Sequence, residues 1–200
     1  HLAGVDTAVA TCGTAFGADH IPLVRRVLGD SEASLEDSRG EVIFTFDPDE
    51  AGQKAATRAF AEQSKFAAQT YVAVPPEGLD PCDLRLQRGD EALAQVISAR
   101  RPMYEFMIKR VVNQSDLNSV EGRAHALRSA LQVVRTIRDG IVRQGYVREL
   151  AGWLGMNPTD VQAELARAPR AADPAPRSAD APSASPEAVY QLASLSADPV

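Results

Sequence analysis

Short apolar runs alternate with longer amphipathic stretches in the first third of the chain. The apolar runs cover residues 7–11, 41–46 and 70–74, and runs of this length bounded by turn residues are typical of buried strands. Between them, residues 19–28 and 50–68 repeat apolar side chains at helical spacing, which predicts two helices. Strands that alternate with helices pair in parallel through right-handed crossovers, so we expect an α/β fold here.

Helical periodicity replaces this alternation after about residue 82. Asn118 is followed three residues later by Glu121, a spacing that resembles a capping box at the start of a helix. Asn157 and Pro158 fit the N-cap and first position of another helix. The predicted helical segments are 83–112 with breaks at Gly89 and at Arg101-Pro102, 118–138, 146–154, and a last helix that begins at Pro158.

Alanine, proline, serine and aspartate dominate the sequence from about residue 169. A segment of this composition cannot bury enough apolar surface to fold alone, so we expect a disordered linker at 169–200. The expected organisation is therefore an α/β part at 1–82, a helical subdomain at 83–168 and this linker.

Composition excludes several classes of protein. The chain has 200 residues, of which 44% are hydrophobic, and it contains neither a run long enough to cross a membrane nor a signal peptide, so we expect a cytoplasmic protein. Cys12 and Cys82 are too few for a disulfide framework or a metal cluster. The net charge of -6 argues against coating nucleic acid by bulk charge, but carboxylates gathered around metal ions would contribute to it.

Acidic side chains follow two of the predicted strands. Asp47 and Asp49 come directly after 41–46, while Asp80 and Asp83 follow 70–74. The carboxyl ends of neighbouring parallel strands, about 5 Å apart, meet at one edge of the sheet. Converging carboxylates repel unless a cation such as Mg²⁺ neutralises them, and two such ions could stabilise the attacking and leaving oxygens of phosphoryl transfer.

A structural interpretation of Asp47 and Asp49 competes with the metal site. They could be loop and N-cap residues of the helix that begins at Glu50, where acidic groups interact favourably with the helix dipole. The residues alone do not choose between these two interpretations.

Four segments of the sequence resemble motifs of one family. Residues 44–56, F-T-F-D-P-D-E-A-G-Q-K-A-A, resemble the D-x-D motif of the Toprim domain in bacterial DNA primases, usually F-D-G-D-x-A-G-x-x-A-A. Residues 8–15 resemble the segment A-V-A-S-x-G-T, with Asp19-His20 at the place of the family's x-H. Residues 76–83, P-E-G-L-D-P-C-D, resemble the loop P-x-G-x-D-P-D, and residues 100–106 resemble the opening of the helical part. The resemblance covers about residues 1–165. The variants Cys-Gly-Thr at 12–14 and Asp-Pro-Cys-Asp at 80–83 resemble an actinobacterial branch of the family.

The resemblance implies a Toprim-type parallel sheet, truncated at its N-terminus, followed by an α-helical subdomain. Asp47 and Asp49 match the family's catalytic, metal-binding aspartates, and Asp80 matches the first aspartate of the next acidic motif. The second falls on Cys82 or Asp83, and Asp83 is the better choice because Mg²⁺ prefers oxygen to sulfur. The implied cofactor is Mg²⁺ or Mn²⁺, as two ions, with zinc only on a family domain outside this chain.

The activity implied by the resemblance is that of a DNA-templated RNA polymerase. Such an enzyme makes short RNA primers for DNA replication by metal-dependent nucleotidyl transfer. The implied partners are single-stranded DNA template, the RNA primer, ribonucleoside triphosphates and the replicative helicase, the last through a region beyond this chain, with no membrane. The expected alternatives are another Toprim enzyme, such as a topoisomerase or nuclease, and a non-catalytic, degenerate Toprim binding module. The helical region after Arg100 argues against the first.

Two departures from the family pattern bear on the site. The family's metal-binding glutamate, in an E-G-Y-x-D-V segment, would precede His1 by about one helix, so we expect a fragment that is inactive by itself. Pro48 stands where glycine is usual. Proline fixes φ near about −65° and disfavours a helical conformation at Asp47, so it reshapes the loop if a positive φ is needed there and otherwise only stiffens it.

Overall fold

Strands β1 (Glu41–Thr45) and β2 (Gln69–Ala73) pair in parallel. The buried side chains of Phe44 and Val72 occupy opposed positions in this register, so aromatic and β-branched residues make the interior of the sheet. Helix α2 (Glu50–Glu62) and a 3-10 turn, η3 (Gln63–Lys65), connect the two strands. The predicted strand–helix–strand crossover is therefore confirmed.

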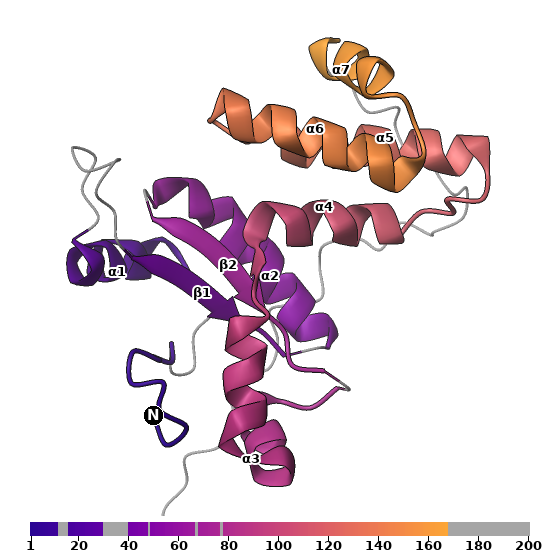
Figure 1. Ribbon diagram of the computed structural model, residues 1–200. Helices are drawn as coiled ribbons and strands as arrows, with labels where there is room; N and C mark the ends of the chain where they lie inside the picture. The colour runs from indigo at the N-terminus through magenta and orange to yellow at the C-terminus, as the bar shows by residue number, and fades with distance from the viewer. Residues whose placement is uncertain (12–15, 30–39, 48, 67, 77, 168–200) are drawn as a thin grey trace, which may run out of the picture. The chain divides into compact units, whose positions relative to one another are not determined.

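The computed structural model describes most of the chain (Figure 1). The described residues are 1–11, 16–29, 40–47, 49–66, 68–76 and 78–167. Within them, His1–Ala166 form one compact unit. Cys12, Pro48 and the linker expected at 169–200 lie outside the described residues, and the boundary expected between 82 and 83 stays a prediction.

A third strand makes the sheet mixed. β3 (Arg101–Pro102) pairs antiparallel with β2, which gives the strand order β1-β2-β3. The parallel pairing expected for β1 and β2 is confirmed, and β3 is an additional edge strand that the sequence did not predict. An Arg-Pro pair has no apolar alternation, and it pairs only because the chain passes β2 on its way into the next helix.

The strand predicted at 7–11 does not form. The side chain of Val9 is 89% exposed, and the segment takes no part in the three-stranded sheet. Its backbone is used locally instead, since Ala8 N–H donates to the Val5 carbonyl (3.4 Å) and the Ala8 carbonyl lies 2.8 Å from His1 Nε2. One valine between two alanines offers too little apolar surface to hold the segment in a sheet.

The helix predicted at 19–28 is confirmed as a 3-10 turn, η1 (Ala18–His20), followed by α1 (Ile21–Leu28).

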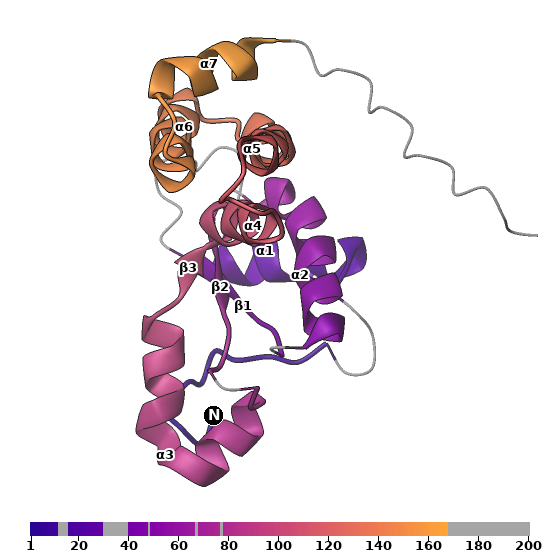
Figure 2. The same cartoon turned by 90° about the vertical axis from the view of Figure 1, so that its right-hand side faces the viewer.

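Four helices follow β3: α4 (Met103–Asn113), α5 (Val120–Arg135), α6 (Gly140–Leu154) and α7 (Pro158–Ala166). Figure 2 shows that α4, then α5 and α6, and finally α7 lie progressively farther from β2. One continuous core of buried side chains runs from Ile21 and Phe44 to Val161. The remaining helix, α3 (Pro81–Ser98), lies between β2 and β3 in the chain.

Several helix boundaries differ from the sequence predictions. The N-cap of α5 is Ser119 rather than Asn118, because the Ser119 hydroxyl accepts from Gly122 N–H (3.1 Å). Helix α6 begins at Gly140, six residues before the predicted start, and its first apolar residue, Ile141, is 85% exposed. An exposed first turn carries no amphipathic signal, which explains the late prediction. The break predicted at Gly89 is confirmed, since α3 is kinked there with φ 84°.

No helix in the described ranges is both long enough and apolar enough to span a membrane.

Candidate metal-binding site

The D-x-D loop joins the end of β1 to the start of α2. Phe46 N–H donates to the Ala73 carbonyl (3.4 Å), so contact with β2 continues one residue past the strand. Asp49 is the N-cap of α2, with an extended backbone, and its Oδ1 accepts from Gly52 N–H at 2.7 Å. The side chains of Asp47 and Asp49 are both exposed. The cap bond uses one oxygen of the Asp49 carboxylate, so the structural interpretation is correct for Asp49 and leaves a second oxygen for a ligand.

Gly52 holds the backbone of Asp47 against the first turn of α2. A Cβ added to Gly52 would lie 2.0 Å from the carbonyl oxygen of Asp47, which is far inside van der Waals contact. Glycine is therefore required here for space. Sequence reasoning quoted Gly52 only as part of the motif. The available signal was a glycine in the first turn of a helix, where it destabilises by about 1 kcal/mol relative to alanine unless something needs its small size.

The second acidic loop ends in the same way. Asp80 is the N-cap of α3, and its Oδ1 accepts from Asp83 N–H at 2.7 Å. Asp80, Cys82 and Asp83 are exposed, and the Cys82 thiol is free. Each acidic loop thus presents one capping aspartate and one further carboxylate to solvent.

The parallel pairing of β1 with β2 brings both loops to one edge of the sheet. Within the described part of the chain, however, no three histidine, cysteine, aspartate or glutamate side chains are gathered closely enough to hold a metal ion. Asp47 and Asp49 lie just after β1, and Asp80 and Asp83 lie at the start of α3, so the described residues form no closed ligand shell.

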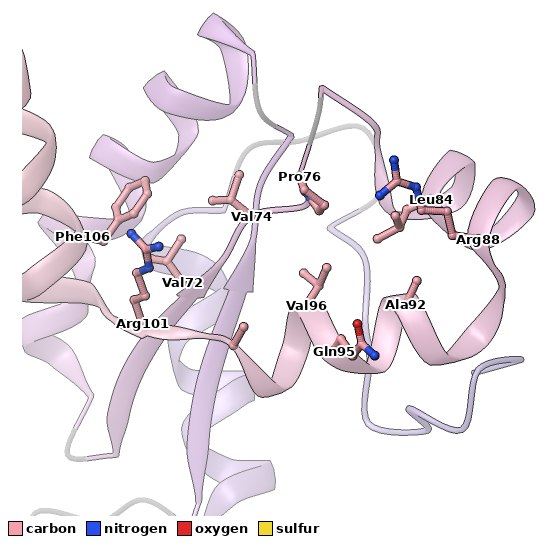
Figure 3. A pocket seen from close by; sticks show the side chains of 11 residues that line it. Val72, Val74, Pro76, Leu84, Arg88, Ala92, Gln95, Val96, Arg101 and Phe106 are labelled. Atoms are coloured by element: carbon pink, nitrogen blue, oxygen red, sulfur yellow. The ribbon is translucent and has the colours of Figure 1, made fainter.

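A cavity of about 410 Å³ lies between β2 and α3 (Figure 3). Its wall is mainly apolar, with Arg101 near the Phe106 end and Arg88 near the Leu84 end. None of the four aspartates lines it. The cavity is therefore distinct from the carboxylate site, and no carboxylate lines it.

A polar contact from α4 reaches the helix that follows the D-x-D loop. Arg110 Nη1 donates to the Gln53 carbonyl (2.9 Å) and to the Thr57 hydroxyl (2.7 Å). No local pattern predicts this contact, because Arg110 lies 57 positions from Gln53 and 53 positions from Thr57.

Aromatic contacts link the same helices. Phe60 of α2 meets Tyr104 of α4 edge to face, and Tyr104 lies 6.2 Å from Tyr146 of α6 between ring centroids. Burial, assisted by the nearby Glu105 carboxylate, raises the pKa of Tyr146 to about 12. Burial also raises the pKa of Tyr104, while a hydrogen bond with Thr136 acts in the opposite direction.

Two protein-family models match the chain. The Toprim domain matches residues 1–74, and the DnaB-helicase binding domain of primase matches residues 104–159. The first match contains β1, the D-x-D loop, α2 and β2, and the second runs from α4 into α7. The region that contacts the replicative helicase was expected beyond this chain. The match to a helicase-binding domain lies instead within the chain, at residues 104–159.

Curated DNA primases are similar to the chain over most of its length. The DNA primase of Mycobacterium tuberculosis is 50% identical over 157 residues, which cover 78% of this chain and 24% of the relative. That of Streptomyces coelicolor is 50% identical over 156 residues, covering 78% of this chain and 23% of the relative. Both relatives are actinobacterial, as the sequence variants predicted. The chain spans about a quarter of the length of these relatives.

Solved primase structures share the fold. The RNA polymerase domain of Mycobacterium tuberculosis primase DnaG in complex with double-stranded DNA matches with a TM-score of 0.65 and 48% identity, over 78% of this chain and 48% of that chain. A DnaG primase catalytic domain bound to single-stranded DNA matches with a TM-score of 0.61 and 28% identity, over 78% and 47% of the two chains. The chain therefore carries a Toprim domain followed by a primase helical region, and it is a homologue of the bacterial DNA primases.

Proposed function

We propose that the chain is part of a DNA primase, which synthesises short RNA primers on a DNA template for replication by metal-dependent nucleotidyl transfer. The observation that carries this proposal is the D-x-D loop at the end of β1, which lies inside the Toprim match and inside the 157 residues that are 50% identical to a DNA primase. The helical region after β3 favours a primase over other Toprim enzymes, because it matches a primase domain.

Asp47 and Asp49 would hold one divalent ion, with Asp80 and Asp83 supporting a second. Their chemistry fits Mg²⁺ or Mn²⁺, since all four are exposed carboxylates and these hard cations prefer oxygen ligands. When bound, such ions stabilise the negative charge on the attacking and leaving oxygens of the transferred phosphate.

The chain itself contributes rigid supports for these carboxylates. The cap bonds of Asp49 and Asp80 fix one oxygen of each side chain at a helix N-terminus. The lack of a side chain at Gly52 lets the Asp47 backbone lie close against the first turn of α2. Ligands that are already oriented lose less conformational freedom on binding, which favours a defined metal geometry.

Single-stranded DNA, the RNA primer and ribonucleoside triphosphates are the proposed substrates. Solved relatives carry double-stranded and single-stranded DNA, which supports a nucleic-acid template. The match at residues 104–159 supports a replicative helicase as the protein partner. Because the chain spans about a quarter of its relatives, we propose that it does not synthesise primers by itself, and primer synthesis by the isolated 200-residue chain would contradict this.

Primer synthesis by the whole protein tests the proposal. Replacing Asp47 by alanine should lower synthesis by about a hundredfold or more, since it removes a proposed metal ligand at an exposed position without opening the core. Asp160→Ala, an exposed aspartate in the first turn of α7, is the matched control and should retain activity. Normal synthesis by the Asp47→Ala protein would show that Asp47 is not a required metal ligand, whereas no synthesis by the wild-type protein would favour a degenerate, non-catalytic Toprim module.

A further inference from the structure

Helix α2 is attached to α4 at both of its ends. Near the start of α2, Arg110 Nη1 binds the Gln53 carbonyl and the Thr57 hydroxyl. Near its end, Phe60 packs edge to face on Tyr104, with ring centroids 5.9 Å apart. Because the late residue of α4 meets the early residues of α2, the two helices run antiparallel and share one interface.

The contact of Arg110 is a closed polar cluster. The Thr57 hydroxyl itself donates to the Gln53 carbonyl at 3.0 Å, so the guanidinium, the hydroxyl and the carbonyl all bind one another. The Arg110 Nε is buried and has no hydrogen-bond partner among the residues that the structure describes. A hydrogen bond from a charged donor is roughly twice as strong as a neutral one. The cluster therefore fixes the position of the Gln53 carbonyl relative to α4.

Gln53 is next to the groups that hold the aspartates. Its own N–H donates to the Asp49 carbonyl at 3.0 Å. The preceding residue, Gly52, donates to the Asp49 carboxylate and packs against the Asp47 backbone. A displacement of the first turn of α2 would consequently move both aspartates.

We infer that Arg110 is a positioning residue that holds the D-x-D loop in place from the helical region. Arg110 lies within residues 104–159, the part that matches a helicase-binding domain. A partner that shifts α4 would therefore shift Asp47 and Asp49 through the same contact. The role of these aspartates as metal ligands rests on the proposed function, whereas the restraint on their loop does not.

Amide hydrogen exchange by NMR on the 200-residue chain tests the restraint directly. Arg110→Met should raise the exchange rate of the Gly52 amide by about tenfold and leave the Gly122 amide within about twofold, because only the first turn of α2 loses its anchor. Arg110→Lys, which keeps the charge but not the forked geometry, should give an intermediate rate.

Arg123→Met is the matched control. Arg123 Nη1 donates to the Leu117 carbonyl at 3.0 Å, so this arginine anchors the loop before α5 and does not contact α2. Its replacement should speed exchange at Gly122 and leave Gly52 unchanged. A folded Arg110→Met chain whose Gly52 amide exchanges like the wild type would overturn the inference.

Manganese binding, measured on the same variants, separates the inference from the proposed function. We expect Arg110→Met to weaken binding by about fivefold, since the ligand loop is less ordered. If the wild-type chain binds no manganese while the Gly52 amide still responds to Arg110→Met, the metal role fails and the positioning role stands. If Arg110→Met does not fold, Arg110→Gln removes the guanidinium and keeps a polar side chain, and an unchanged Gly52 amide in that variant would also reject the inference.

Discussion

Two loops of the molecule share a capped glycine that closely approaches an upstream backbone carbonyl, but they present different side chains. In the Toprim region, Asp49 caps α2 through the N–H of Gly52, and the Asp47 carbonyl would lie 2.0 Å from a Cβ on that glycine. In the helical region, Ser119 caps α5 through the N–H of Gly122, and the Asp116 carbonyl would lie 1.8 Å from the corresponding Cβ.

The difference between these loops lies in the capping side chain. The hydroxyl of Ser119 has one oxygen, which accepts the cap hydrogen bond and carries no charge. The Asp49 carboxylate has a second oxygen beyond the one that caps α2, and it places a negative charge at the edge of the sheet. Helix capping and metal binding are therefore compatible at Asp49. The N-cap interpretation holds for Asp49, and it does not compete with the metal-binding interpretation, which stays a prediction.

The two glycines should respond alike in stability and differently in metal binding. Gly52→Ala and Gly122→Ala should each destabilise the fold by about 1–3 kcal/mol, because the new Cβ meets a backbone carbonyl that must move. Only Gly52→Ala should also weaken manganese binding. Urea denaturation and manganese titration measure the two effects, and a Gly52→Ala chain as stable as the wild type would disprove the close packing.

Replacing each capping residue separates the effect of its charge from the effect of its hydrogen bond. Asp49→Asn keeps an N-cap acceptor but removes the charge, so stability should change by less than about 0.5 kcal/mol while manganese binding falls. Ser119→Ala should cost about 1 kcal/mol of stability and leave manganese binding unchanged. Equal loss of metal affinity in both variants would show that the comparison of the two caps is wrong.

The pH dependence of stability should come from the helical region at high pH. Burial raises the pKa of Tyr146 to about 12 from its ordinary value of 10.0, and that of Tyr104 upward as well. A raised folded-state pKa means that the folded chain holds the proton longer than the unfolded chain, so the contribution is complete below pH 10 and is lost between pH 10 and about 12.

Tyr146→Phe should reduce the loss of folding stability at high pH, because phenylalanine has no hydroxyl that can ionise. Urea denaturation at pH 9 and pH 11, read with tyrosine absorbance, measures it. The phenylalanine variant should lose less stability between these two values than the wild type does, and an identical loss in both proteins would place the titrating group elsewhere.

Much of the sheet region could be predicted from the sequence, because its signals are local. Most residues of β1 and β2 are β-branched or aromatic, and Asp49 lies directly before an alanine-rich helical pattern. The strand predicted at 7–11 fails for lack of apolar side chains. The two-residue strand β3 has no periodicity that could reveal it.

Contacts between distant residues could not be predicted in this way. Arg110 binds Gln53 across 57 positions, and a half-buried arginine has the same sequence signature as an exposed one. A glycine in the first turn of a helix is the only sequence signal for the close approach at Gly52, and it does not identify the partner, which is a backbone carbonyl rather than a side chain. The location of the helicase-binding match within residues 104–159 came from comparison with relatives and not from any local pattern.

Manganese titration of the whole protein, with and without Asp47→Asn, tests most directly whether the D-x-D loop holds a divalent ion. The substitution keeps the size of the side chain and removes its charge, so the fold should be unaffected. We expect manganese to bind the wild type and the affinity to fall by about tenfold or more in the variant, as for the loss of a charged oxygen ligand. Equal affinity in the two proteins would contradict the assignment of Asp47 as a metal ligand.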